Sequence, residues 1–228
     1  MRAPAHFPLA SGGGTASVAA PMKKLIFSLL TLTTAAFAAD GDGWQQLFNG
    51  KDLDGWKANE KPETFNVKDG ELVVKGDRCH LFYTGAVNGA DWKNFELKAE
   101  IMTKKGANSG LYFHTEFQKD GWPAKGYEIQ VNNSHTDPKR TAGVYAVKDN
   151  FDVVAKDDVW FTMEIKVEGK HIVTKVDGKV VSDFTEPEGW VPPKGMDGRR
   201  ISHGTVAVQG HDPGSEVHYK SIAIKALP

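Results

Sequence analysis

The sequence has one cysteine, Cys79, in 228 residues and almost no net charge, because 28 Lys and Arg balance 29 Asp and Glu. A single thiol cannot form a disulfide within the chain, so a hydrophobic core must stabilise the fold. A net charge of −1 with mixed signs gives no electrostatic footprint for nucleic acid or for an anionic membrane. The composition therefore predicts neither partner, and its 40% of hydrophobic residues is ordinary for a globular protein.

The chain also lacks an apolar run long enough to span a membrane, which takes about 20 residues. The apolar stretch 25–37 is shorter than that and is rich in Thr and Ala. Met-Lys-Lys at 22–24 precedes it, and Ala-Phe-Ala at 36–38 has the small-x-small pattern of a cleavage site. We expect a signal peptide at 22–39 that exports the protein to the periplasm or the extracellular space; a buried hydrophobic helix is the alternative.

The segment 1–21, which precedes this signal, is of low complexity. We expect it to be a disordered extension or the result of a start assigned too early, with the true start at Met22. The remaining 40–228 would then form a single exported domain without a membrane span.

Helical periodicity is absent as well, since no stretch of 10 residues has a convincing 3.6-residue repeat. Short strand-like segments are present instead, and turn signals such as Asp69-Gly70, Glu168-Gly169-Lys170 and Asp177-Gly178 separate them. This pattern predicts an all-β fold, an antiparallel β-sandwich of jelly-roll type. The expected strands are 64–75, 95–103, 109–117, 127–131, 142–147, 160–169, 171–184, 204–211 and 217–227, and the long loops are 117–126, 132–141 and 185–203.

Several of these strands carry a polar row on one face. In GYEIQVNN (126–133) the odd positions are apolar and the even positions are polar, and successive side chains of a strand point to opposite faces. The polar row is either a ligand-binding face or an ordinary solvated outer face. We expect Tyr127, Ile129 and Val131 in the core, and the polar rows to contain Glu128, Gln130 and Asn132, then Tyr112, His114 and Glu116, then Gln209 and His211.

Six segments resemble, in order, signatures of the 3-keto-disaccharide hydrolase domain family, and they span essentially the whole of 40–228. The resemblance implies the concanavalin A-like lectin/glucanase sandwich and attack on glycosides whose sugar carries a ketone at carbon 3. In jelly-roll sandwiches of this kind the concave sheet carries the ligand groove, so the polar rows would face a sugar. The segments are FNGKDLDGW (48–56), NFELKAEIM (94–102), NSGLYFH (108–114), GYEIQV (126–131), TAGVYAV (141–147) and GTVAVQGHDPGS (204–215).

The implied substrate suggests a mechanism. A ketone at carbon 3 acidifies the hydrogen on carbon 2, so a base can remove it and the enolate can expel the aglycone, after which water adds. Glu128 and His211 are the candidates for proton transfer, and which of them is the base stays open. A two-carboxylate glycosidase mechanism is disfavoured, because the E-x-D-x-x-E strand motif of glucanases with this fold is missing.

The remaining candidates would bind the substrate, an oligosaccharide or a 3-keto-glycoside. Many family members have Arg at the position of His114, so recognition here would differ. An arginine from a loop could reach over the groove and hold a carbonyl or hydroxyl oxygen, with a solvated side chain as the alternative. The predicted substrate-binding residues are Asn108, Tyr112, His114, Gln130, Asn132, Lys139, Arg140, Tyr145, Arg200 and Gln209.

No cofactor follows with certainty from the sequence. A divalent metal ion is possible, because His211 and Asp212 could join Glu128 around it, although no ligand-spacing motif supports such a site. A simple His-Asp turn beside Pro213 is the alternative. A non-catalytic carbohydrate-binding module would use the same fold and face, without a tuned acid or base.

Overall fold

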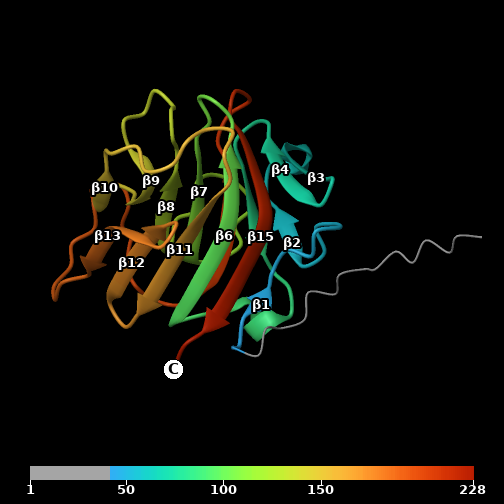
Figure 1. The fold of residues 1–228 in the computed structure, drawn as a ribbon. Helices are drawn as coiled ribbons and strands as arrows, with labels where there is room; N and C mark the ends of the chain where they lie inside the picture. Colours follow the sequence, from blue (N-terminus) through green and yellow to red (C-terminus); the bar gives the residue numbers. More distant parts are fainter. Residues whose placement is uncertain (1–41) are drawn as a thin grey trace, which may run out of the picture. The chain divides into compact units, whose positions relative to one another are not determined.

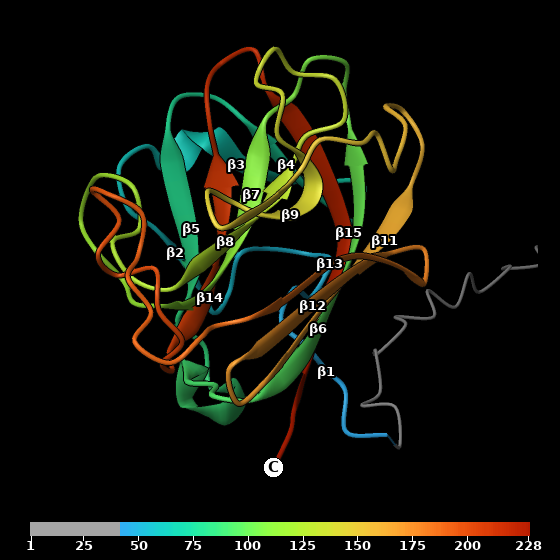
Figure 2. The ribbon, with the colours of Figure 1, turned by 90° about the vertical axis from the view of Figure 1, so that its left-hand side faces the viewer.

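The structure, a computed structural model, describes residues 42–228, and the predicted signal peptide and upstream extension lie outside this range. Two antiparallel sheets pack face to face (Figures 1 and 2). This arrangement confirms the predicted all-β sandwich. Within residues 42–228, no helix has the length and apolar character needed to span a membrane.

The eight-stranded sheet lies nearer the viewer in Figure 1. Its strands follow the order β13-β12-β11-β6-β15-β4-β3, and β1 pairs with β15 outside this path. The bounds are β1 (Gln45–Gln46), β3 (Phe65–Lys68), β4 (Glu71–Lys75), β6 (Phe95–Thr103), β11 (Phe161–Glu168), β12 (His171–Val176), β13 (Lys179–Thr185) and β15 (Glu216–Ala226).

The seven-stranded sheet lies behind it, in the order β10-β9-β8-β7-β14-β5-β2. Its central strands β7, β8 and β14 include the segments in which the sequence predicts polar rows. The bounds are β2 (Trp56–Ala58), β5 (Cys79–Tyr83), β7 (Ser109–Thr115), β8 (Tyr127–Val131), β9 (Arg140–Val144), β10 (Lys148–Asn150) and β14 (Thr205–Gly210).

All three predicted turn signals connect neighbouring antiparallel strands. Strand β3 pairs with β4, β11 with β12, and β12 with β13. In the last turn, Asp177 and Gly178 have φ angles of 48° and 77°, the left-handed geometry that two-residue hairpins require. The predicted strands 64–75 and 171–184 are therefore each a hairpin rather than one strand.

Strand β5 is absent from the predicted set, as are the short strands β1, β2 and β10 and two 3-10 turns, η1 (Pro62–Thr64) and η2 (Val87–Ala90). All five residues of β5, Cys-His-Leu-Phe-Tyr, are buried. A strand buried on both faces has no polar and apolar alternation, so periodicity alone does not detect it.

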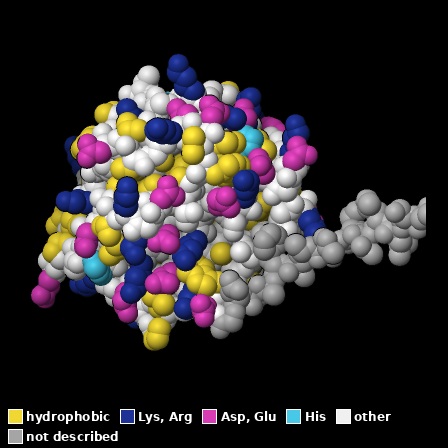
Figure 3. All heavy atoms as spheres, viewed as in Figure 1, with side chains coloured by type: hydrophobic (Ala, Val, Ile, Leu, Met, Phe, Trp, Pro, Cys, Tyr) yellow, Lys and Arg dark blue, Asp and Glu magenta, His cyan; other side chains and the backbone are white. Residues whose placement is uncertain are grey.

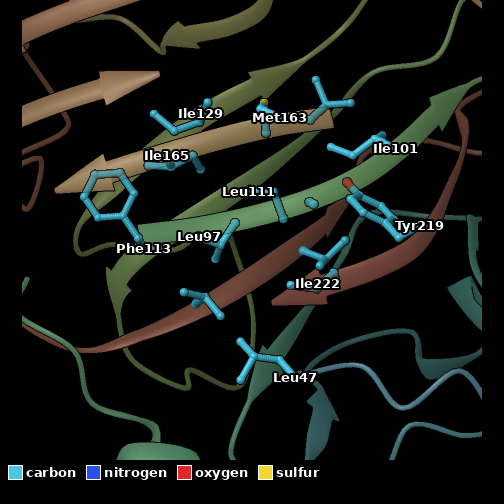
Figure 4. Close-up of a cluster of buried hydrophobic side chains, with 14 of the residues drawn as sticks. Leu47, Leu97, Ile101, Leu111, Phe113, Ile129, Met163, Ile165, Tyr219 and Ile222 are labelled. Atoms are coloured by element: carbon cyan, nitrogen blue, oxygen red, sulfur yellow. The ribbon is translucent and has the colours of Figure 1, made fainter. Parts of the chain in front are cut away.

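Apolar side chains from both sheets fill the space between them (Figure 4). Leu97 and Ile101 from β6 and Ile165 from β11 meet Leu111 from β7 and Ile129 from β8 in one buried cluster. Tyr127, Ile129 and Val131 are fully buried members of the same cluster. The predicted core face of β8 is therefore confirmed, and its other face points away from the core.

Candidate functional site

A pocket of about 710 Å³ lies on the face of the seven-stranded sheet that points away from the core. The sheet and the ends of its strands supply most of its polar side chains, and each of the three predicted long loops supplies part of its wall. Its lining comprises Asn108, Tyr112, Glu128, Gln130, Tyr145, Gln209 and His211 from the strands and their ends, and Trp122–Ala124, Asp137 and Gly195–Arg199 from the loops.

Glu128 is the centre of a buried polar network in this pocket. Tyr112 donates a hydrogen bond of 2.8 Å to Oε2, Arg199 forms an ion pair of 3.0 Å with the same oxygen, and Gln209 donates to Oε1 at 2.7 Å. Glu128 is only 5% exposed, so the alternative that it belongs to a solvated outer face is wrong. A Cβ at position 110 would lie 2.7 Å from Oε1, which explains the glycine there.

The pKa of Tyr112 is raised well above its usual value, because the phenol is buried and the charge of Glu128 lies beside it, and Arg199 opposes this effect only in part. The Tyr112 hydroxyl therefore stays protonated and acts as a donor. This keeps the hydrogen bond to Glu128 intact over the whole physiological pH range.

Arg199 reaches the carboxylate from the loop 185–203. Its guanidinium lies 5.6 Å from the ring centroid of Tyr112 and 5.8 Å from that of Tyr145. The preceding Gly198 packs so closely on the neighbouring loop that a Cβ would overlap the carbonyl oxygen of Ala124. The two loops lie side by side at the left of Figure 2. Their contact positions the arginine over the pocket.

His211 and Asp212 form a second polar unit at the end of β14. The His211 Nδ1 atom lies 2.7 Å from Asp212 Oδ2, and the carboxylate also accepts from the Ser215 hydroxyl and the Gly214 amide, both at 2.8 Å. Burial alone would raise the pKa of Asp212, but the bonds from His211, Ser215 and Gly214 hold it below its usual value. Asp212 is thus a fixed anion that orients the imidazole.

Seven of the predicted site residues line the pocket together: Asn108, Tyr112, Glu128, Gln130, Tyr145, Gln209 and His211. Among them, Gln130 donates to Asn108 at 3.0 Å. The predicted Lys139 lies at the edge of the pocket, with its ammonium 3.9 Å from the ring centroid of Tyr145 and 3.3 Å from Asp149.

Three other predicted residues stabilise loops instead of lining the pocket. The Asn132 amide donates to the carbonyl oxygens of Asp137 and Lys139. The Arg140 guanidinium donates to the carbonyl oxygens of His135 and Asp137 and to Asn132. Arg200 donates to the Trp190 carbonyl oxygen, and its neighbour Arg199 takes the place in the pocket that we predicted for Arg200.

The prediction that His114 lies on the same face as Tyr112 is wrong. His114 has a φ angle of 55°, and the pairing of β7 with β14 shifts its register at this point. The resulting bulge breaks the alternation. The ring packs beside Phe95 and Phe113, Nε2 lies 2.9 Å from the Lys93 carbonyl oxygen, and Nδ1 accepts from the Ser202 amide.

Glu128, His211 and Asp212, which the sequence left open as ligands of a divalent metal ion, do not form a metal-binding group. Among residues 42–228, no group of three or more His, Cys, Asp or Glu side chains is placed to hold a metal ion. Glu128 is surrounded by the donors Tyr112, Arg199 and Gln209, and His211 is paired with Asp212.

None of the nine lining residues that the loops supply was among the predicted site residues, and these nine include Trp122 and Arg199. Trp122 and Arg199 lie in the predicted long loops 117–126 and 185–203, and the length of these loops was the signal that could have pointed to them. His135, in the predicted loop 132–141, also lies near the site, with its ring centroid 5.8 Å from that of His211.

Comparisons with known proteins identify the family and the fold of the chain. Residues 43–225 match the family model described as a 3-keto-alpha-glucoside-1,2-lyase-like domain. A 3-keto-disaccharide hydrolase of Bacteroides thetaiotaomicron is 31% identical over 121 residues, which cover 44% of this chain and 41% of that relative. The chain therefore spans less than half the length of the curated relative that it matches.

The solved structures that resemble the chain have the same sandwich. A proposed glycosyl hydrolase of Parabacteroides distasonis superposes with a TM-score of 0.69 at 23% identity, covering 82% of this chain and 94% of that one. A second from the same organism has a TM-score of 0.62 at 25% identity, covering 81% and 99%. A carbohydrate-binding module of Bacillus subtilis has a TM-score of 0.53 at 14% identity, covering 75% and 96%.

Proposed function

The chain belongs to the 3-keto-alpha-glucoside-1,2-lyase-like domain family, and we propose that it is a carbohydrate-active enzyme that cleaves glycosides of 3-keto sugars in the pocket on its seven-stranded sheet. The observation that carries this proposal is the presence of two different polar units in one pocket. An oriented His-Asp pair can move a proton, and a buried arginine held by a carboxylate can stabilise a developing negative charge.

We assign the proton transfer to His211. Hydrogen bonding of Nδ1–H to Asp212 leaves Nε2 as the acceptor of the neutral ring. That nitrogen takes the hydrogen from carbon 2 of the sugar, and the electrons of the C–H bond form the enolate of the carbon 3 ketone. This assignment favours His211 over Glu128 as the base, because three donors already occupy the Glu128 oxygens.

We assign the stabilisation of the enolate oxygen to Arg199. Its Nη2 is bound to Glu128, whereas its buried Nη1 has no hydrogen-bond partner among residues 42–228. A guanidinium presents several donors in a fixed plane, so one edge can hold the carboxylate while the other meets a ligand oxygen. Glu128 is then a positioning residue for the arginine.

The enolate next expels the group on carbon 1. The C1–O bond breaks, a double bond forms between carbons 1 and 2, and the protonated His211 returns its proton to the departing oxygen. Water then adds at carbon 1 and restores the proton at carbon 2, so the net reaction is hydrolysis. Each step uses the ketone, which is why the parent glycoside would not react.

The test is incubation of the purified protein with 3-keto-glucosides and with the parent glucosides, followed by measurement of aglycone release. Release from the 3-keto compounds alone is expected. Equal release from both would contradict the elimination mechanism, because it would mean that the ketone has no role. Binding of the sugars without release from either would leave the non-catalytic carbohydrate-binding module as the better function.

A further inference from the structure

A histidine that the proposed reaction does not use lies under the wall of the pocket. His80 in β5 is paired directly with Gln209 in β14, and residues directly opposite in an antiparallel pair present their side chains on the same face. The His80 ring is fully buried. It meets Tyr112 edge-on with a centroid distance of 5.4 Å and Trp122 with a centroid distance of 5.3 Å, and both of these residues line the pocket.

Neither ring nitrogen of His80 has a hydrogen-bond partner among residues 42–228, and the same is true of the buried Oε1 atom of Gln209. Burial lowers the pKa of His80 to about 3, so the ring is neutral and has one donor and one acceptor. Native proteins leave few buried polar groups unpaired, and each such group calls for a water, an ion or a ligand. Here three unpaired atoms belong to neighbouring side chains.

Trp122 separates this spot from the open part of the pocket. Trp122 is 44% exposed, and its ring packs against His80 in β5 and against His211, just beyond the end of β14, with a centroid distance of 5.5 Å to the latter. The loop that carries it is held by Gln118, whose amide donates to the carbonyl oxygens of Asp120 and Trp122. Of the three aromatic rings that pack around His80, those of Phe82 and Tyr112 are buried and that of Trp122 is exposed, so Trp122 is the ring whose movement would open a path to His80.

We propose that His80 and Gln209 form a hydrogen-bonding subsite beneath Trp122 that receives one hydroxyl group of the bound sugar. A hydroxyl is both donor and acceptor, so it can accept from the His80 N–H and donate to Gln209 Oε1. A water molecule can form the same two hydrogen bonds when no sugar is bound. The inference rests on the proposed function to the extent that it takes the ligand to be a sugar.

The test compares His80→Phe with the unchanged residue, both in a His211→Asn background that prevents turnover during titration. The ligands are methyl 3-keto-glucoside and its 2-, 4- and 6-deoxy analogues, with Kd measured by calorimetry. One deoxy analogue is expected to bind about 10-fold more weakly than the parent when His80 is present, and equally well when it is Phe. The interaction is thereby assigned to one hydroxyl.

Two further variants serve as controls for this experiment. His218→Phe, on the eight-stranded sheet where His218 pairs with Glu71 and Glu216, should leave the preference among the four ligands unchanged. His80→Gln restores a donor and an acceptor and should restore part of the discrimination. Thermal unfolding of each variant establishes that the compared proteins are folded.

The outcomes separate this inference from the proposed function. If discrimination depends on His80 but the wild type releases no aglycone from 3-keto-glucosides, the subsite stands and the enzyme assignment fails. If aglycone is released but His80→Phe discriminates as the wild type does, the subsite is overturned and the enzyme assignment stands. Failure of all four ligands to bind also overturns the subsite.

Discussion

Strands β8 and β11 have the same alternating pattern but different environments. In β8, all five side chains are buried, including the polar Glu128 and Gln130. In β11, the apolar residues are buried, while Glu164 and Lys166 are partly exposed and Glu168 is exposed. The pattern therefore identifies the core face of a strand, but it does not say what covers the other face.

The difference comes from the loops. Within residues 42–228, the outer face of the eight-stranded sheet is open, and positive and negative side chains are interspersed over it (Figure 3). The outer face of the seven-stranded sheet is covered by the segments around Trp122 and Arg199, which line the pocket. Polar residues under such a cover must pair with each other or with a ligand, because water does not solvate them. A buried polar face is thus the better candidate for a site.

The largest contrast between the two faces is expected in catalysis. His211→Asn removes the proton-transfer group and should lower kcat/KM for a 3-keto-glucoside by about 10² to 10⁴, equivalent to roughly 3 to 5 kcal/mol of transition-state stabilisation. The matched control is His171→Asn on the eight-stranded sheet, where His171 pairs with the exposed Asp183. Its kcat/KM should equal that of the wild type.

Asp212→Asn tests the positioning role within the same experiment. It should lower kcat and change the pH profile of kcat, because the imidazole loses the anion that orients it. A His211→Asn protein with undiminished turnover would contradict the assignment and would return Glu128 to the role of base.

The next contrast concerns stability. Arg199→Met leaves the Glu128 carboxylate buried without its ion-pair partner, and breaking a buried pair in this way typically costs about 3 to 5 kcal/mol in the free energy of unfolding. The control is Lys166→Met, which removes the partner of Glu168 at an exposed position and should change the free energy by less than about 1 kcal/mol. Urea unfolding measures both, and equal effects would mean that the loops do not exclude water from Glu128.

Most of the fold could be predicted from the sequence. Strands β6 and β8 have the predicted bounds, and the three turn signals are hairpins, because alternation and turn chemistry are local properties. Strand β5 was missed because both its faces are buried. His80 lies in β5, and it was therefore not among the predicted site residues.

The site was predictable in its strands and less so in its loops. Strand alternation predicted the face of Glu128 and Gln209 correctly, and it failed at His114, where a bulge reverses the side chain. The choice between Arg199 and Arg200 depends on the path of the loop backbone, which the contact of Gly198 with Ala124 sets. That contact joins residues distant in sequence and has no local signature.

The free energy of unfolding should also depend on pH, through two buried histidines. The folded pKa values of His80 and His114, about 3 and about 4 because of burial, lie below the unfolded value of about 6.5. At pH values between the folded and the unfolded pKa, the unfolded chain binds protons that the folded protein does not bind. The contribution of the two histidines to the free energy of unfolding is therefore fully present above about pH 6.5 and is lost as the pH falls. Each histidine contributes up to about 1.4 kcal/mol per pH unit.

His80→Phe removes one of the two contributions. Between about pH 6 and pH 4.5, the variant should therefore gain about 2 kcal/mol in its free energy of unfolding relative to the wild type. Urea unfolding at several pH values measures the difference. Parallel curves for the two proteins would show that His80 becomes protonated in the folded state, and would contradict its burial as a neutral ring.

The smallest effect is expected on the open face. Lys98 and Glu164 are cross-strand neighbours at 3.6 Å, with side chains 48% and 28% exposed. A double-mutant cycle with Lys98→Met and Glu164→Gln isolates this pair from the contact of Lys98 with the Trp44 ring. The coupling energy should be about 0.2 to 1 kcal/mol and should shrink in about 1 M salt, where the screening length is roughly 3 Å. A coupling energy above about 2 kcal/mol that does not change with salt would mean that this face is shielded from water like the pocket face. The difference between the two sheets would then have to come from the types of residue on them and not from the loops that cover one of them.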